Sequence, residues 1–109
     1  MKKELFELHA QICKTLANPK RLEIIYALKD GEKSAGEIVA ALGIPKANAS
    51  QHLSVLKACG VVRTRREGVN IFYSIASPKI VEACVLMKEV LMEQMEERQH
   101  LLGKLKRAK

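Results

Sequence analysis

No stretch of the sequence approaches the roughly eighteen consecutive apolar residues that a membrane-spanning helix needs. The N-terminal segment MKKELFEL contains glutamates and is amphipathic, so it does not have the pattern of a signal sequence. These absences argue against a membrane protein. We expect a cytoplasmic protein with no membrane partner.

Cysteine is scarce, and no two cysteines form a C-x-x-C pair. The three that are present are Cys13, Cys59 and Cys84, an odd number at spacings that do not indicate a disulfide framework. The sequence also lacks a glycine-rich phosphate loop, and no cysteine has a partner at a spacing typical of a Cys/His hydrolase or a thiol oxidoreductase. We therefore expect that the protein is not an enzyme.

Internal repeats and low-complexity segments are absent as well, and the length of 109 residues allows one domain, residues 1–109. The formal net charge is +7, with a pI near 9.5. Such a positive balance favours a nucleic acid or another acidic surface as partner, although charge alone does not separate DNA from an anionic membrane.

Residues 34–59 have the pattern of two helices joined by a tight turn. Ser34 and Glu37 have the spacing of a capping box, which predicts the start of the first helix. Gly43 tolerates the left-handed conformation that ends a helix, and Pro45 cannot continue one. The second helix is therefore expected to begin near Lys46, which is the arrangement of a helix-turn-helix.

The second helix of this pair has one apolar stripe, formed by Ala49, Leu53 and Leu56, and no acidic residue between positions 46 and 57. Amides and hydroxyls can address base edges, and lysines can contact phosphates. The candidate DNA-binding residues on the polar face are Lys46, Asn48, Ser50, Gln51, Ser54 and Lys57. His52 is expected either to face DNA or to hold a neighbouring side chain by a hydrogen bond.

Residues 61–75 change to a strand-like pattern. Strands are expected at 61–65 and 70–75, with a turn at Glu67 and Gly68. The hairpin is basic, and its candidate DNA-binding residues are Arg63, Arg65 and Arg66. They would contact the phosphate backbone or a minor groove, as the wing of a winged helix does. The alternative is a solvated hairpin whose charges protect an edge strand from aggregation.

The two ends of the chain are expected to be helices that form a dimer. Residues 1–17 and 78–105 each have an apolar stripe, and Asn18 with Pro19 predicts another helix that continues through Leu28. The stripe in the last helix consists of Ile80, Cys84, Met87, Leu91 and Met95. It could pair with its symmetry mate in a coiled-coil-like seam or serve as a contact within one chain. The fold class is thus mainly α with a β-hairpin, a winged helix-turn-helix that dimerises through its terminal helices.

Three segments together resemble the arsenic-repressor (ArsR/SmtB) family of small winged-helix transcriptional repressors. They are LANPKRLEII from Leu16, SQHLxxLKxxGVV from Ser50, and RxEG with FY between Arg65 and Tyr73. The resemblance spans nearly the whole chain. It implies a homodimer that binds operator DNA and releases it when an inducer binds; an inverted repeat is the operator expected for such a dimer.

The resemblance does not identify the inducer. Soft-metal sensors of the family carry cysteines where this chain has Ser34 and Gly36, and zinc-type sensors need the Asp and His that are absent between residues 77 and 95. Persulfide sensors carry a cysteine at the position that corresponds to Tyr26.

The remaining sensor candidates are the cysteines themselves. Cys13 and Cys84 would approach each other across the dimer and bind a thiophilic metal or metalloid, or react with an oxidant. Cys59 is a candidate reactive thiol. The alternative is that all of them are small buried apolar residues and that a small organic ligand is the inducer.

A winged-helix protein-interaction module is the remaining alternative for the function. Such a module would be expected to expose apolar residues on its second motif helix, where this sequence has polar residues.

Overall fold

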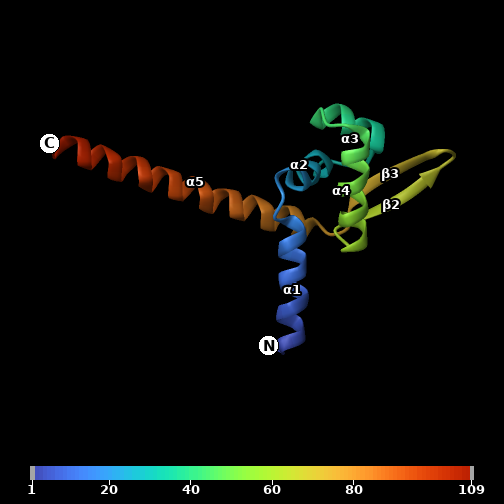
Figure 1. Cartoon of the computed structure of the whole chain (residues 1–109), viewed down its shortest axis with the longest axis horizontal. Helices are drawn as coiled ribbons and strands as arrows, with labels where there is room; N and C mark the ends of the chain where they lie inside the picture. The colour runs from blue at the N-terminus through green and yellow to red at the C-terminus, as the bar shows by residue number, and fades with distance from the viewer. Residues whose placement is uncertain (1, 109) are drawn as a thin grey trace.

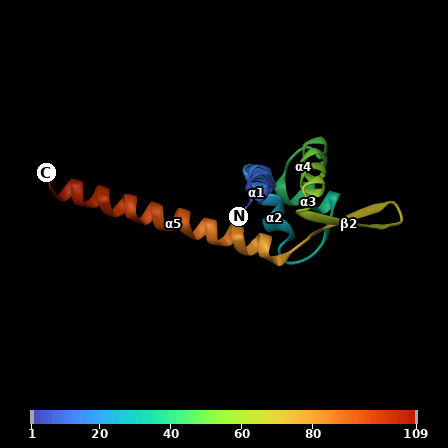
Figure 2. The ribbon, with the colours of Figure 1, turned by 90° about the horizontal axis from the view of Figure 1, so that it is seen from below.

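The computed structural model describes residues 2–108. Its elements are α1 (Lys3–Leu16), α2 (Pro19–Leu28), β1 (Lys33–Ser34), α3 (Ala35–Leu42), α4 (Lys46–Ala58), β2 (Val62–Glu67), β3 (Asn70–Ile75) and α5 (Pro78–Arg107). A body of α2, α3, α4 and the strands carries two projecting helices, α1 and α5 (Figures 1 and 2). Residues 1 and 109, which belong to the predicted domain, lie outside the described residues.

The predicted helix ends are confirmed where local chemistry determines them. The Asn18 side chain accepts hydrogen bonds from the backbone amides of Lys20 and Arg21, at 2.9 and 3.2 Å. Ser34 and Glu37 form the predicted capping box, and Gly43 ends α3 with a φ of +66°. Because Gly has no Cβ, it adopts this left-handed conformation without strain.

The sheet has three strands in the order β1-β3-β2, whereas the sequence pattern predicted two. The missing strand, β1, has two residues, too few to show an alternating pattern. The predicted turn was also wrong by one residue. Glu67 pairs with Asn70, so the turn consists of Gly68 and Val69, and Gly68 has the positive φ of +63°.

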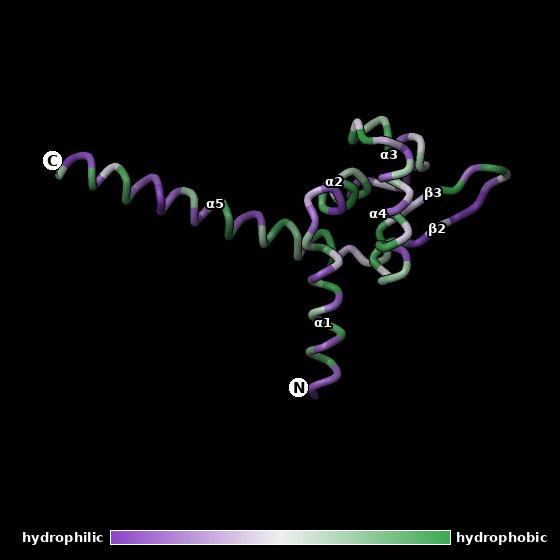
Figure 3. Tube along the Cα trace, in the orientation of Figure 1, coloured by the Kyte–Doolittle hydropathy of each residue, from purple (hydrophilic) through white to green (hydrophobic). Residues whose placement is uncertain are grey.

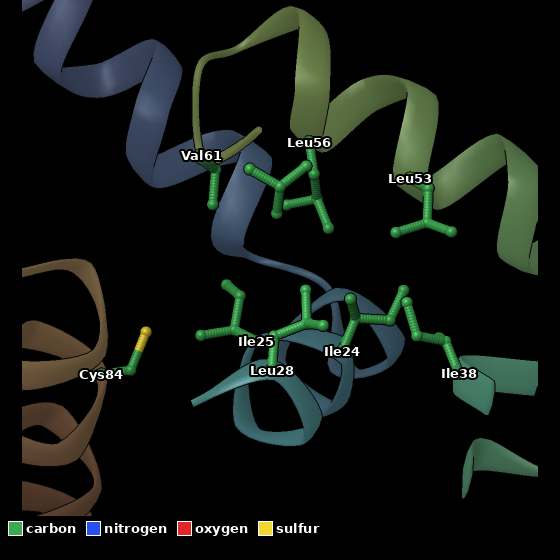
Figure 4. Close-up of a cluster of buried hydrophobic side chains, with 9 residues drawn as sticks. Ile24, Ile25, Leu28, Ile38, Leu53, Leu56, Val61 and Cys84 are labelled. Atoms are coloured by element: carbon green, nitrogen blue, oxygen red, sulfur yellow. The ribbon is translucent and has the colours of Figure 1, made fainter. Parts of the chain in front are cut away.

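The core lies between α2, α3 and α4. Its largest fully buried side chains are Ile24, Ile25, Leu28, Ile38, Leu53, Leu56 and Val61 (Figure 4). Cys84 of α5 packs at the edge of this cluster, where it is 9% exposed. The apolar stripe predicted for the second motif helix therefore forms the contact that fixes α4 on the body.

The helices α1 and α5 leave apolar surface uncovered. Figure 3 shows alternating hydrophobic and hydrophilic turns along the part of α5 that projects from the body. The predicted stripe of this helix is divided, because Ile80 and Cys84 pack on the core of their own chain. Met87, Leu91 and Met95 remain 68, 54 and 53% exposed. Among the described residues, no helix is both long and apolar enough to cross a membrane.

Candidate nucleic-acid interface

The helix α4 presents its polar face to solvent. Ala49, Leu53 and Leu56 are fully buried, and this anchors the helix by one side. All candidate DNA-binding residues of α4 except His52 are exposed. They are Lys46, Asn48, Ser50, Gln51, Ser54 and Lys57. Short amides and hydroxyls on a helix without acidic side chains can approach base edges and phosphates without electrostatic repulsion.

His52 is held by a neighbouring helix. Arg21 of α2 donates a hydrogen bond from Nε to His52 Nδ1 at 3.3 Å, and from Nη1 to the Thr15 carbonyl at 3.1 Å. This half-buried arrangement favours the second of the two roles expected for His52, a hydrogen bond that holds a neighbouring side chain.

Arg21 was not identified from the sequence as part of this surface. It connects the end of α1 to the middle of α4, because its two hydrogen bonds go to Thr15 and His52. The Thr15 hydroxyl also lies 3.3 Å from Cys59 Sγ at the end of α4. The helix α1 is thus linked to the candidate DNA-binding helix at two points.

The hairpin of β2 and β3 forms the candidate wing beside α4 (Figure 1). Arg63 and Arg66 are exposed, and neither forms an ion pair with any described residue. Figure 3 shows that most of β2 is hydrophilic. These two guanidinium groups are therefore free to contact phosphates.

Unlike Arg63 and Arg66, Arg65 forms ion pairs with other residues of the chain. Its guanidinium forms ion pairs with Glu32, at 2.5 Å, and with Glu67, at 2.7 Å. It also lies over the ring of Phe72, 4.7 Å from the centroid. The hydrogen bond from Arg65 lowers the pKa of Glu32, and the two carboxylates raise the pKa of Arg65.

Two of the candidate sensor cysteines, Cys13 and Cys84, lie on different helices of one chain. Cys13 of α1 and Cys84 of α5 line the same groove of about 800 Å³ within one chain, together with Tyr26 of α2. A groove lined by both thiols is therefore present in a single chain. Cys13 is exposed, whereas burial raises the pKa of the Cys84 thiol. Between residues 2 and 108, no three His, Cys, Asp or Glu side chains are grouped so that they could hold a metal ion.

Comparison with known proteins identifies the family. The family described as bacterial regulatory protein, arsR family, matches residues 18–64. Rv0081, an uncharacterized HTH-type transcriptional regulator of Mycobacterium tuberculosis, is 38% identical over 103 residues, which cover 94% of this chain and 90% of that protein. A biofilm growth-associated repressor of Agrobacterium fabrum is 47% identical over 70 residues, which cover 64% of this chain and 60% of that protein.

Solved structures agree with this assignment. The crystal structure of Rv0081 matches with a TM-score of 0.80 and 38% identity, and the match covers 89% of this chain and 98% of that one. The solution structure of the homodimeric winged helix-turn-helix DNA-binding domain Mb0332 from Mycobacterium bovis has a TM-score of 0.78 and 35% identity, over 86% of this chain and 87% of that one. The predicted winged helix-turn-helix, mainly α with a β-hairpin, is therefore confirmed. The chain belongs to the arsR family of bacterial regulatory proteins and is a DNA-binding winged helix-turn-helix regulator, not an enzyme.

Proposed function

We propose that this protein is a dimeric repressor that binds an inverted-repeat operator and leaves it when an inducer binds. The observation that supports this most directly is the exposed face of α4, which has amides, hydroxyls and lysines and no carboxylate. The Agrobacterium fabrum relative is named as a repressor. Because operator DNA is the proposed target, we also place the protein with that DNA in the cytoplasm.

The proposed dimer uses α1 and α5. In a single chain these helices expose large apolar side chains, among them Leu8 at 58%, Leu91 at 54% and Leu102 at 51%. Within residues 2–108, no other helix or strand covers these side chains. Mb0332, whose fold is similar, is described as homodimeric. Twofold symmetry would place the two copies of α4 on half-sites about one DNA turn apart, or a multiple of it.

The DNA contacts are tested by Gln51→Ala and Arg66→Ala, which should have different effects. Gln51→Ala should lose about 1–3 kcal/mol of discrimination between operator and random DNA, because it removes a group that can read a base edge. Arg66→Ala should weaken binding to both DNAs and lower the slope of log K against log salt by about one, because it removes a phosphate contact. Titration with fluorescently labelled operator and random duplexes, each at several salt concentrations, measures both quantities.

Equal effects of the two substitutions on both DNAs would contradict these assignments. No preference of the wild-type protein for any DNA would instead favour a winged-helix protein-interaction module. The polar face of α4 argues against that alternative, because protein interfaces are usually depleted of charged side chains at their centre.

For the inducer, we propose a thiophilic metal or metalloid, or an oxidant, that acts on Cys13 and Cys84. Support comes from the groove that both cysteines line, and from its position between α1, α2 and α5. One subunit offers two thiols in this groove, so a metal ion would need other ligands, such as solvent or the second subunit. An inducer bound here would move α1 and α5 relative to each other and so change the separation of the two α4 helices.

The inducer hypothesis predicts that Cys13→Ser and Cys84→Ser each abolish release while operator affinity is retained. A hundredfold release corresponds to about 2.7 kcal/mol of coupling between inducer and DNA. Cys59→Ser is the matched control and should leave release unchanged, because Cys59 does not line the groove. Operator binding is measured with arsenite, zinc, peroxide and persulfide as separate additions. A triple serine variant that still releases DNA would show that the cysteines do not sense the inducer.

A further inference from the structure

Arg65 connects the two edges of the sheet. The strand order is β1-β3-β2, and Arg65 lies on β2 directly opposite Phe72 of β3. Glu32 immediately precedes β1, the strand on the other side of β3. The Arg65 side chain therefore crosses the central strand, over the ring of Phe72, to reach Glu32.

The contacts of Arg65 use all three nitrogens of its guanidinium. Nε and Nη2 donate hydrogen bonds to the two carboxylate oxygens of Glu32, at 3.2 and 2.5 Å, and Nη1 donates to Glu67 at 2.7 Å. A planar fork that binds one carboxylate through two bonds holds a defined geometry. Arg65 contributes one positive charge and its two partners contribute two negative charges, so the cluster has no excess positive charge to offer a phosphate.

The other two arginines of β2 keep their positive charge available for a phosphate. Arg63 and Arg66 are exposed and form no ion pair within residues 2–108. Successive side chains alternate between the two faces of a strand, so Arg63 shares a face with Arg65 and Arg66 lies on the opposite face. The strand β2 thus carries one unpaired guanidinium group on each face, and Arg65 links this strand to the segment before β1.

We propose that Arg65 is a positioning residue for DNA binding: it holds the hairpin against the segment before β1 so that Arg63 and Arg66 reach the phosphates. This inference rests on the proposed function, because it assumes that the hairpin contacts DNA. It also reassigns Arg65, which the sequence pattern placed among the residues that contact DNA directly.

Direct phosphate contact by Arg65 and positioning by Arg65 predict opposite changes in DNA affinity for the substitution Glu32→Gln. Glu32→Gln removes a negative charge near the wing, and in a purely electrostatic view the loss of that charge strengthens binding to a polyanion. If Arg65 positions the wing, the same substitution releases the hairpin and weakens binding. Asp30→Asn is the matched control, since Asp30 lies in the same segment, is exposed and forms no ion pair with a described residue.

The experiment compares Glu32→Gln, Arg65→Gln, the double variant, Asp30→Asn and Arg66→Gln by operator titration at several salt concentrations. We expect Glu32→Gln and Arg65→Gln each to weaken binding about fivefold, the upper range for exposed ion pairs. The double variant should be no weaker than Arg65→Gln, because the two residues act through one contact. In the Glu32 and Arg65 variants, the loosened hairpin must be ordered when DNA binds, but Arg63 and Arg66 then still contact phosphates. The salt slope should therefore stay at the wild-type value in these variants and fall by about one only in Arg66→Gln.

A measurement without DNA separates positioning from phosphate contact. Amide hydrogen exchange in the free protein should be faster across β2 and β3 in Glu32→Gln and Arg65→Gln than in the wild type, and unchanged in Arg66→Gln. Tighter DNA binding by Glu32→Gln, or a lower salt slope in Arg65→Gln, would overturn the proposal. A wild-type protein that does not bind DNA would refute the proposed function instead, and the exchange result would still show whether Arg65 holds the hairpin.

Discussion

Replacing Leu53 by alanine is expected to lower the free energy of unfolding by about 2–5 kcal/mol. Leu53 is fully buried in the core cluster that joins α4 to α2 and α3 (Figure 4). Truncation removes apolar contacts and leaves a cavity that a body of this size closes only in part. Because single domains are stable by only about 5–15 kcal/mol, much of the stability is lost. Urea denaturation followed by circular dichroism measures the change.

Ser54→Ala is the control for this prediction, since it changes the adjacent residue on the exposed face of α4. Its free energy of unfolding should stay within about 0.5 kcal/mol of the wild type, as for most surface substitutions. Operator affinity, in contrast, should fall in Ser54→Ala even though the fold is intact. If Leu53→Ala were as stable as Ser54→Ala, α4 would not depend on the core contact that the structure shows.

Replacing Leu91 by alanine is expected to dissociate the proposed dimer. The Leu91 side chain is 54% exposed in one chain, on the part of α5 that continues beyond the body. Truncation of a large apolar side chain that is buried in the assembly costs about 2–5 kcal/mol, so the dimer dissociation constant should rise at least about thirtyfold. Sedimentation velocity over a range of protein concentrations measures this constant.

The loss of the dimer should also be visible on DNA. A monomer can contact only one half-site, so Leu91→Ala should bind the full operator about as weakly as a single half-site. Glu93→Ala, at an exposed polar position of the same helix, should leave both the dimer and operator affinity unchanged. A wild-type chain that sediments as a monomer and binds one half-site with full affinity would contradict the proposed assembly.

The positions where the sequence predicted structure correctly are those where few neighbouring residues decide the outcome. Asn18 with Pro19, Ser34 with Glu37, and Gly43 satisfy backbone groups within their own turn of helix. The turn of the hairpin shows the limit of such reasoning. Gly68 was identified, but whether Glu67 belonged to the turn or to β2 depended on its pairing with Asn70.

Contacts between distant segments were not visible in the sequence. Glu32 and Arg65 are separated by 33 positions, and Arg21 and His52 by 31 positions. Because a polar side chain can face either solvent or a partner, the sequence pattern assigned Arg65 to the DNA surface and left two roles open for His52. Only the packing of the folded chain shows that both side chains already form hydrogen bonds with other residues of the protein.

The sequence by itself determined the order of the helices and of the two hairpin strands, the apolar stripe that anchors α4 and the acid-free face opposite that stripe. Periodicity and capping are local properties, and each depends on residues within one or two turns. Only the tertiary structure placed Arg65 between Glu32 and Glu67, added β1 to the sheet and brought Cys13 and Cys84 into one groove. These features depend on how the helices and the sheet pack, since packing brings together residues that are far apart in the chain.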